Sequence, residues 1–312
     1  MELSFDSIAS LVAAAESAGR PLSALVLEQQ AAQLERSEAD VYETMRASYE
    51  VMRTAAAEGL KPGVRSASGL TGGDARRLHE HLQTNGSLIG GLLPQAMATA
   101  LAVSEWNAAM GRIVAAPTAG SCGILPGALL TMETARGVPQ RACVMSLFTA
   151  AAVGMVIAEN ASVSGAQGGC QAECGSASAM AAAALVELAG GTPAQTAHAV
   201  AIALKNILGL VCDPVAGLVE IPCEKRNASG VANAFAAAEL ALAGVESAIP
   251  ADEVIDAMRR VGETMPPALR ETAEGGLAAT PTGRSLFAQV FGEKAPGGCA
   301  ACGACGKTSA SS

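Results

Sequence analysis

The chain has 312 residues, of which half are hydrophobic and 16% are charged, with a net charge of −9 at pH 7 and a pI near 4.9. This acidic balance argues against nucleic-acid binding, because proteins that bind phosphate backbones expose basic surfaces. Residues 1–6 lack the basic segment and apolar run of a secretory signal, so we expect a cytoplasmic protein whose nine cysteines are buried, metal-bound or catalytic rather than disulfide-bonded.

Amphipathic helices are expected near both ends of the chain. Ser37 with Asp40 resembles a helix-capping box. Apolar side chains follow it at helical spacing, at Val41, Met45, Tyr49 and Met52. A second apolar stripe lies near the other end, at Val254, Ile255, Met258 and Val261. Between the first helix and the central region, residues 58–74 are rich in Gly, Ser and Pro, which predicts a surface loop or a lid.

The centre of the chain is predicted to consist of Ala-rich, nearly uncharged helices separated by short Gly/Pro turns. We expect these helices over residues 94–113, 124–135, 141–159, 173–188, 193–208 and 229–245. Alternating β-branched segments typical of strands are missing from the pattern. The predicted fold class is therefore all-α: one large helical domain with Ala-rich buried central helices and Gly/Pro-rich loops over residues 1–292, followed by a flexible Cys/Gly/Ser-rich tail over residues 293–312.

Two long uncharged stretches raise the question of a membrane. Residues 82–104 contain Gly and Pro residues that interrupt a spanning helix, and residues 142–158 are at the short limit for a span. A helix that is apolar on all sides is also typical of the centre of a large helical domain. We therefore predict that neither stretch spans a membrane and that the protein has no membrane partner.

The common signatures of metal and nucleotide sites are absent from the sequence. None of the three histidines lies in a zinc or protease motif, and neither a phosphate-binding loop nor a dinucleotide-binding fingerprint is present. His198 lies in an apolar helical segment and is predicted to be a hydrogen-bonded core residue. His79 and His81, beside the 58–74 loop, keep open both a structural and a functional role.

Three turns between the central helices are the candidate sites. Residues 117–123 offer backbone N–H groups and hydroxyls at the start of a helix, which suits a substrate carboxylate, although a tight turn that satisfies its own hydrogen bonds explains them equally well. The Gly-rich turn at 162–174 brings Cys170 to a helix start, where the helix dipole favours a thiolate. The loop at 209–223 carries Cys212 and Cys223 near its two ends.

Three cysteines on loops inside a helical core suit an iron–sulfur cluster, because such clusters prefer thiolate ligands. Three ligands rather than four would leave one iron open to act as a Lewis acid. The spacing of Cys170, Cys212 and Cys223 matches no general cluster motif, and buried free cysteines are common. The residues by themselves therefore leave both a cluster and ordinary core packing open.

At these positions the sequence resembles the α chain of the bacterial iron–sulfur-dependent L-serine dehydratases. The resemblance extends to about residue 292 and runs through PTAGSCG (117–123), SVSGAQGGCQAECG (162–175), KNILGLVCDPVAGLVEIPCEKRN (205–227) and TPTGR (280–284). It implies that Cys170, Cys212 and Cys223 hold a [4Fe–4S] cluster, with Cys174 as the rival for the first position. Cys122 and Cys143 fall outside this ligand set and are interpreted as small packing residues.

The resemblance also implies the reaction, the elimination of water from L-serine to give pyruvate and ammonia, without pyridoxal phosphate. The turn at 117–123 is predicted to bind the substrate carboxylate, through Thr118, Ala119, Gly120 and Ser121. Asn206 is a further candidate for the pocket. The lesser candidates are Lys205 and the cluster at 224–227, in which Arg226 is equally interpreted as a structural ion-pair partner.

The catalytic base is left unassigned. In this family the proton acceptor is expected to be a histidine in a Ser-Ser-Ser-His-Thr-type segment of the β domain, and the sequence contains no such segment. The family occurs as one fused chain or as separate α and β chains. The resemblance therefore implies a β-chain partner without which the chain is inactive.

Two alternative functions stay open. A related cluster-dependent lyase acting on L-cysteine or L-threonine would need only a different leaving group or one more methyl group. An iron–sulfur carrier or sensor would use the C-x2-C-x2-C run of the tail, Cys299, Cys302 and Cys305. Within the enzyme, these tail thiols are interpreted as a cap on the fourth iron, as a cluster-loading or redox-sensing device, or as incidental.

Overall fold

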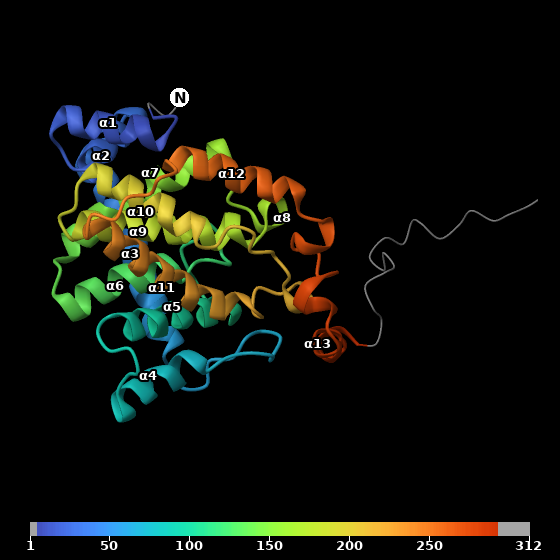
Figure 1. Ribbon diagram of the computed structural model, residues 1–312. Helices are drawn as coiled ribbons and strands as arrows, with labels where there is room; N and C mark the ends of the chain where they lie inside the picture. The colour runs from blue at the N-terminus through green and yellow to red at the C-terminus, as the bar shows by residue number, and fades with distance from the viewer. Residues whose placement is uncertain (1–4, 293–312) are drawn as a thin grey trace, which may run out of the picture.

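The computed structural model of the protein describes residues 5–292, so the predicted tail with Cys299, Cys302 and Cys305 lies outside the described residues. Within the described range, thirteen α-helices are joined by short 3-10 and π turns, and the only β pairing is an isolated bridge between Cys212 and Arg270. The predicted all-α class is confirmed (Figure 1). The helices are α1 (Ile8–Ala18), α2 (Leu22–Gln33), α3 (Glu38–Gly59), α4 (Asp74–Asn85), α5 (Leu93–Ala108), α6 (Ile124–Arg136), α7 (Gln140–Asn160), α8 (Gly165–Gly168), α9 (Ser176–Leu188), α10 (Pro193–Lys205), α11 (Cys223–Leu242), α12 (Ala251–Thr264) and α13 (Pro281–Phe291).

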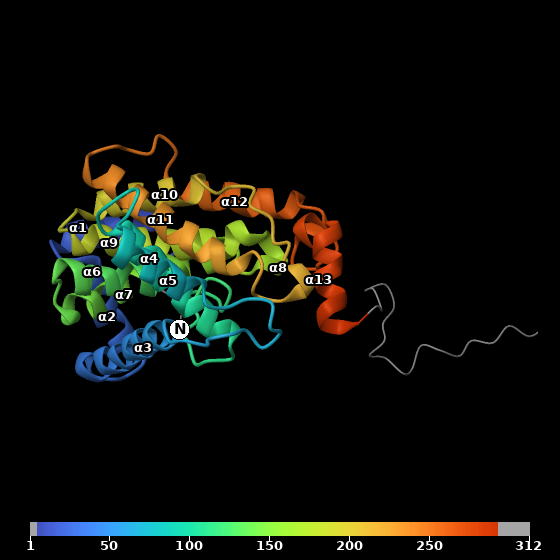
Figure 2. The same ribbon diagram turned by 90° about the horizontal axis from the view of Figure 1, so that it is seen from below.

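The core is built around α9, in which every residue from Ser176 to Val186 is buried. Helices α6, α7, α10 and α11 pack around it. Alanine-rich faces permit this arrangement, since small side chains allow neighbouring helices to approach from several sides. Figures 1 and 2 show α1 and α2 at one end of the molecule and α8 and α13 toward the other. The predicted burial of the central helices is confirmed.

The outer helices follow their sequence signals. The hydroxyl of Ser37 accepts a hydrogen bond from the backbone N–H of Asp40 and so caps the start of α3, as predicted. Val41, Tyr49 and Met52 are buried on one side of that helix. Helix α12 buries Val254, Ile255 and Met258 in the same way. Each helix therefore covers the core with a single apolar stripe.

Helix α11 is the main departure from the predicted boundaries. It begins at Cys223 rather than at residue 229, six residues earlier, and includes the charged Glu224-Lys225-Arg226 run that resembles a loop in the sequence. Pro222 directly precedes the helix, where a missing N–H is tolerated, and Glu224 in the first turn suits the helix dipole. Cys223 is therefore presented by a helix start and not by a flexible loop.

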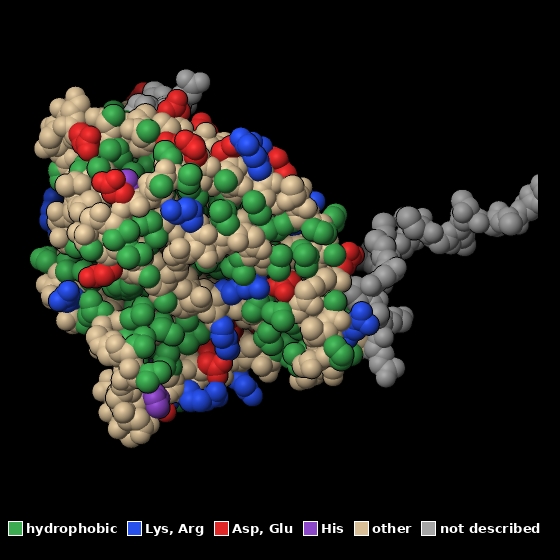
Figure 3. All heavy atoms as spheres, viewed as in Figure 1, with side chains coloured by type: hydrophobic (Ala, Val, Ile, Leu, Met, Phe, Trp, Pro, Cys, Tyr) green, Lys and Arg blue, Asp and Glu red, His purple; other side chains and the backbone are tan. Residues whose placement is uncertain are grey.

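Helix α7 is the one helix in the described part of the chain that is long and apolar enough to cross a membrane. In its most apolar stretch, 67% of the residues are buried inside the protein, as in the core helix of a large domain. Side chains on the face shown in Figure 3 are mostly uncharged, with Lys/Arg and Asp/Glu intermixed rather than gathered into a broad basic patch.

Helices α3 and α5 cross closely at Gly59. A Cβ atom at this position would lie 1.9 Å from the backbone oxygen of Ala102. We expect Gly59→Ala to lower the free energy of unfolding by about 3 kcal/mol, because backbone must move to make room. Urea unfolding checks this value, with the exposed α3 substitution Thr54→Ala as a control expected to change stability by less than about 1 kcal/mol. Equal stability of the two variants would contradict the close crossing.

Candidate metal centre

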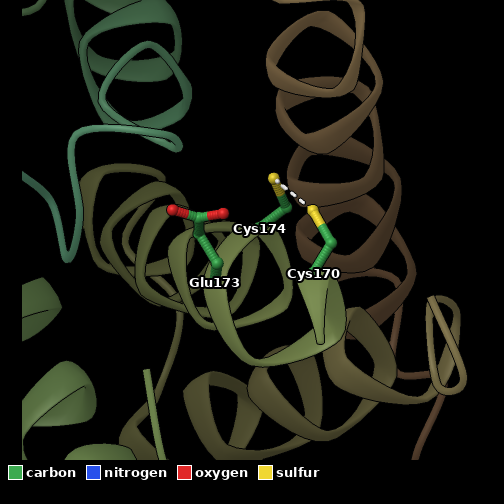
Figure 4. A group of neighbouring side chains, drawn as sticks. All are labelled: Cys170, Glu173 and Cys174. Carbon is green, nitrogen blue, oxygen red and sulfur yellow. Dashed lines mark hydrogen bonds between the residues drawn. The ribbon is translucent and has the colours of Figure 1, made fainter. Parts of the chain in front are cut away.

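A π turn (η1, Gln171–Gly175) precedes α9 and brings three ligand-type side chains together. Glu173 and Cys174 lie in this turn and Cys170 directly precedes it, and Figure 4 shows the three side chains near one another. The two sulfur atoms are 3.3 Å apart, and the ligand atoms of all three residues lie within 4.8 Å of one another. All three are buried. Because a π turn inserts an extra residue into the helical repeat, it is often found where side chains must converge on a functional site.

Cys212 and Cys223 come from two other segments and lie near Cys170 and Glu173. Burial raises the pKa of both thiols, and the negative charge of Cys170 raises both pKa values further. The sulfur of Cys212 also lies so close to Gly165 of α8 that a Cβ there would be 2.8 Å from it. The contact of Cys170 with Cys174 and its electrostatic interactions with Cys212 and Cys223 define a set of four buried cysteines, the cysteine group, which consists of Cys170, Cys174, Cys212 and Cys223.

Gln171 links the segment of Cys170 to its neighbours. This fully buried side chain donates hydrogen bonds to the backbone oxygens of Gly168 and Met258, at 3.0 and 2.9 Å. Its own side-chain oxygen accepts a 2.9 Å hydrogen bond from the N–H of Gly209, at the start of the loop that leads to Cys212. The position of Cys170 relative to that loop is thus set by a satisfied buried amide.

Cys212 is held from its other side by the segment before α13. Its N–H donates to the oxygen of Leu269 at 2.9 Å, and its oxygen accepts from the N–H of Glu271 at 2.8 Å. Glu271 has φ +65°, in the left-handed region that non-glycine residues seldom adopt. Its side-chain oxygen would be 3.2 Å from a Cβ on Gly165, so this carboxylate lies beside Cys212. The sequence pattern did not identify Glu271, because nothing local marks a lone loop glutamate.

Arg226 brings positive charge to the cysteine group. Its Nη1 donates to the oxygen of Val211 at 2.9 Å, and its Nη2 pairs with Asp213 at 2.8 Å. The hydrogen bond between the two thiols lowers the pKa of Cys170 and raises that of Cys174. The positive charge of Arg226 adds to the lowering at Cys170, against the opposing effect of burial. The ion-pair interpretation of Arg226 is thus confirmed, and the pair lies at the site.

The turn at 117–123 lies against Glu173. The hydroxyl of Thr118 donates to this carboxylate, whose pKa is raised by burial, and a Cβ on Gly120 would lie 2.4 Å from its Oε1. Ser121 is buried with its hydroxyl 3.1 Å from that of Thr118, and Ala119 is exposed. The turn therefore does receive a carboxylate, but in this structure the carboxylate is that of Glu173. Its role toward a substrate carboxylate stays a prediction.

Asn227 connects the same turn to α11. Its amide nitrogen donates to the backbone oxygens of Gly120 and Cys223, at 2.7 and 2.9 Å, and its oxygen accepts from the N–H of Gly123 at 2.8 Å. The side chain is fully buried. The turn and Cys223 are thus held together by one amide.

The predicted loop or lid at 58–74 packs against the loop between Cys212 and Cys223. The hydroxyl of Ser68 donates to Glu220 at 2.8 Å, and that of Thr71 donates to Glu224 at 2.6 Å and lies 3.1 Å from Glu220. Both carboxylates are buried. In this structure the segment therefore braces the cysteine-bearing loop from outside.

Asn206 and Lys205 lie elsewhere. The amide of Asn206 donates to Asn233, ten residues after Cys223 and hence about 15 Å further along α11. Lys205 donates to the hydroxyl of Ser247 at 2.8 Å. The structure does not bring these two side chains to the cysteine group, and the pocket role of Asn206 stays a prediction.

The remaining candidates have ordinary structural surroundings. Cys122 and Cys143 are fully buried, with their sulfurs 4.0 and 3.7 Å from the backbone oxygens of Val103 and Leu129, and burial raises the pKa of Cys122 to about 12. His198 accepts a 3.1 Å hydrogen bond from the N–H of Ser247, which confirms the predicted hydrogen bond, but its side chain is half-buried rather than in the core. The other two histidines are exposed on α4.

The cysteine group fits an iron–sulfur cluster by its chemistry. Buried thiolates are the ligands that such clusters prefer over the oxygen ligands of calcium or magnesium. An arginine beside the sulfurs offsets part of their negative charge. Hydrogen-bonded segments hold the thiols in place, as the outer shell of a metal centre does.

Comparison with known proteins shows which family the chain resembles. Residues 17–278 match the family model described as "Serine dehydratase alpha chain". The chain is 55% identical over 271 residues to the "Probable L-serine dehydratase, alpha chain" of Bacillus subtilis, covering 87% of this chain and 90% of that one. It is 48% identical to the "L-serine dehydratase, alpha chain" of Peptoniphilus asaccharolyticus, covering 84% and 90%. "L-serine dehydratase 2" of Escherichia coli is 39% identical, and the match covers 88% of this chain but 61% of that longer one.

Proposed function

The chain belongs to the serine dehydratase alpha-chain family, and we propose that it is the α chain of an L-serine dehydratase that holds a [4Fe–4S] cluster on Cys170, Cys212 and Cys223. The observation that carries this proposal is the convergence of buried thiols from three separate segments. The names of the relatives specify L-serine, which favours this substrate over L-cysteine or L-threonine. Cytoplasmic location is part of the same proposal, because free thiolate ligands require a reducing compartment.

The chemistry follows from what surrounds the thiols. A bound cluster supplies Lewis acidity for the departure of hydroxide from L-serine, which leads to pyruvate and ammonia. The residues of the chain prepare the place where this happens: burial of the cysteine group excludes bulk water, and Arg226 supplies fixed positive charge. The turn at 117–123 closes the side next to Glu173 and is proposed to orient the substrate carboxylate through its N–H and hydroxyl donors. That orientation requires the turn to exchange its contact with Glu173 for one with substrate.

The base that removes the Cα proton is proposed to come from a β chain. Among the described residues, His198 is engaged with Ser247, and His79 and His81 are exposed on α4, so none of the three is a candidate beside the cysteine group. The family description as an alpha chain supports a partner subunit. The longer Escherichia coli relative, which extends well beyond the match, supports the same idea.

We expect this chain alone, reconstituted with iron and sulfide without oxygen, to bind the cluster but to give no pyruvate from L-serine above background. Adding the β chain of the same enzyme should restore turnover, because the missing proton acceptor then completes the site. Pyruvate formation is followed in a coupled assay, with iron content measured in the same sample as the control for loading. Full turnover by the single chain would contradict the proposed need for a partner.

A further inference from the structure

The cysteine group is assembled from segments far apart in the sequence, and one side chain contacts or interacts with all of them. We propose that Arg226 is the positioning residue of this centre. It aligns the segments that carry Cys170, Cys212 and Cys223 and balances the negative charge gathered there. The inference rests on the proposed function, because it takes these cysteines to be cluster ligands.

The guanidinium is anchored on both sides of Cys212. Arg226 lies three residues after Cys223 on α11, so both side chains leave the same side of the helix. One guanidinium nitrogen donates to the oxygen of Val211 and another pairs with Asp213, at 2.9 and 2.8 Å. These contacts flank Cys212 in the sequence. The planar fork of arginine therefore sets the register between α11 and the cysteine-bearing loop.

The same ion pair reaches a further segment. Asp213 uses its second carboxylate oxygen to accept a 2.8 Å hydrogen bond from the N–H of Leu277, in the 3-10 turn before α13. Gly276 permits this approach, since a Cβ there would lie 2.4 Å from that oxygen. The side chains of Arg226 and Asp213 are only 16% and 5% exposed. This degree of burial makes the pair sensitive to the loss of either partner.

Arg226 also acts toward Cys170. Its positive charge stabilises the thiolate of Cys170 across the site, and the negative charge of Cys170 stabilises the guanidinium in turn. Glu173 and Glu271 add negative charge on the same side, since both interact electrostatically with the thiols. Several negative groups in one largely buried place repel each other unless a cation is present. Arg226 is thus both a geometric link and a counter-charge.

The test separates these two roles with Arg226→Lys and Arg226→Gln in the full chain. Lysine keeps the positive charge but lacks the planar guanidinium with its several donors. We therefore expect a folded protein that takes up about tenfold less iron and sulfide on anaerobic reconstitution. The reduction potential of the cluster in the loaded fraction should stay near the wild-type value. Glutamine removes the charge as well, so we expect the same loss of loading together with a more negative potential. Iron and sulfide assays and a redox titration followed by absorbance give both quantities.

Arg53→Lys and Arg53→Gln are the matched controls. Arg53 makes two 2.8 Å contacts with Glu133 but lies between α3 and α6, and these variants should load iron like the wild type. Circular dichroism of each apo variant establishes folding, and if Arg226→Gln does not fold, the loading of Arg226→Lys decides the outcome. Wild-type loading and potential in folded Arg226 variants would overturn this inference and leave the proposed function intact. A wild-type chain that binds no iron would instead overturn the proposed function.

Discussion

Cys223→Ser is expected to lower the iron bound after anaerobic reconstitution by at least about tenfold and to abolish turnover of L-serine in the presence of the β chain. A serine hydroxyl stays protonated near neutral pH, whereas the metal requires a thiolate. The exchange of sulfur for oxygen hardly changes the volume at the start of α11, so the apo protein should fold normally. Iron and sulfide assays, with the visible absorbance of the cluster, measure the loss.

Cys143→Ser is the matched control for that substitution. Cys143 is equally buried but contacts the backbone oxygen of Leu129 and lies outside the cysteine group, so its serine variant should load iron fully. Serine variants of Cys170 and Cys174 decide which of these neighbours is the ligand, since their sulfurs lie only 3.3 Å apart. Retention of iron in Cys223→Ser together with its loss in Cys143→Ser would refute the proposed centre.

Asn227→Ala is expected to lower the free energy of unfolding of the apo chain by about 4 kcal/mol. The substitution removes the side-chain partner of two backbone groups, the oxygen of Gly120 and the N–H of Gly123. A buried polar group left without a partner costs about 1–3 kcal/mol, and the turn at 117–123 holds these groups away from water. Denaturant unfolding followed by circular dichroism gives the value.

Asn233→Ala, on the same helix, serves as the comparison. Asn233 is partly buried, donates to the oxygen of Ala203 and accepts from Asn206, and we expect its loss to cost about 1–2 kcal/mol. A cost for Asn227→Ala no greater than that for Asn233→Ala would mean that water replaces the amide. The turn would then not depend on Asn227 for its place beside Cys223.

Local patterns predicted α3, α12 and the six central helices, because helix formation depends on neighbours a few residues apart, whereas α1, α2, α4, α8 and α13 were not predicted. The cap at Ser37, the stripe on α3 and the buried, Ala-rich α9 all follow from side chains within one or two turns of each other. The predicted start of α11, at residue 229, was wrong by six residues. A charged run resembles a loop when its packing is not known. The likeness of the ordered blocks to a known family identified Cys170, Cys212 and Cys223 as candidates.

The sequence by itself thus determined that the chain is helical, that its centre is buried, and which thiols to examine. Only the tertiary structure decided what surrounds those thiols. The π turn places Cys174 beside Cys170, Glu173 accepts a hydrogen bond from the turn at 117–123, and Arg226 contacts the loop of Cys212. The physical reason is distance along the chain. A helix forms from contacts within a few residues, whereas Glu173 and Thr118 are 55 residues apart and Arg226 and Val211 are 15 residues apart, so these contacts exist only once the helices have packed.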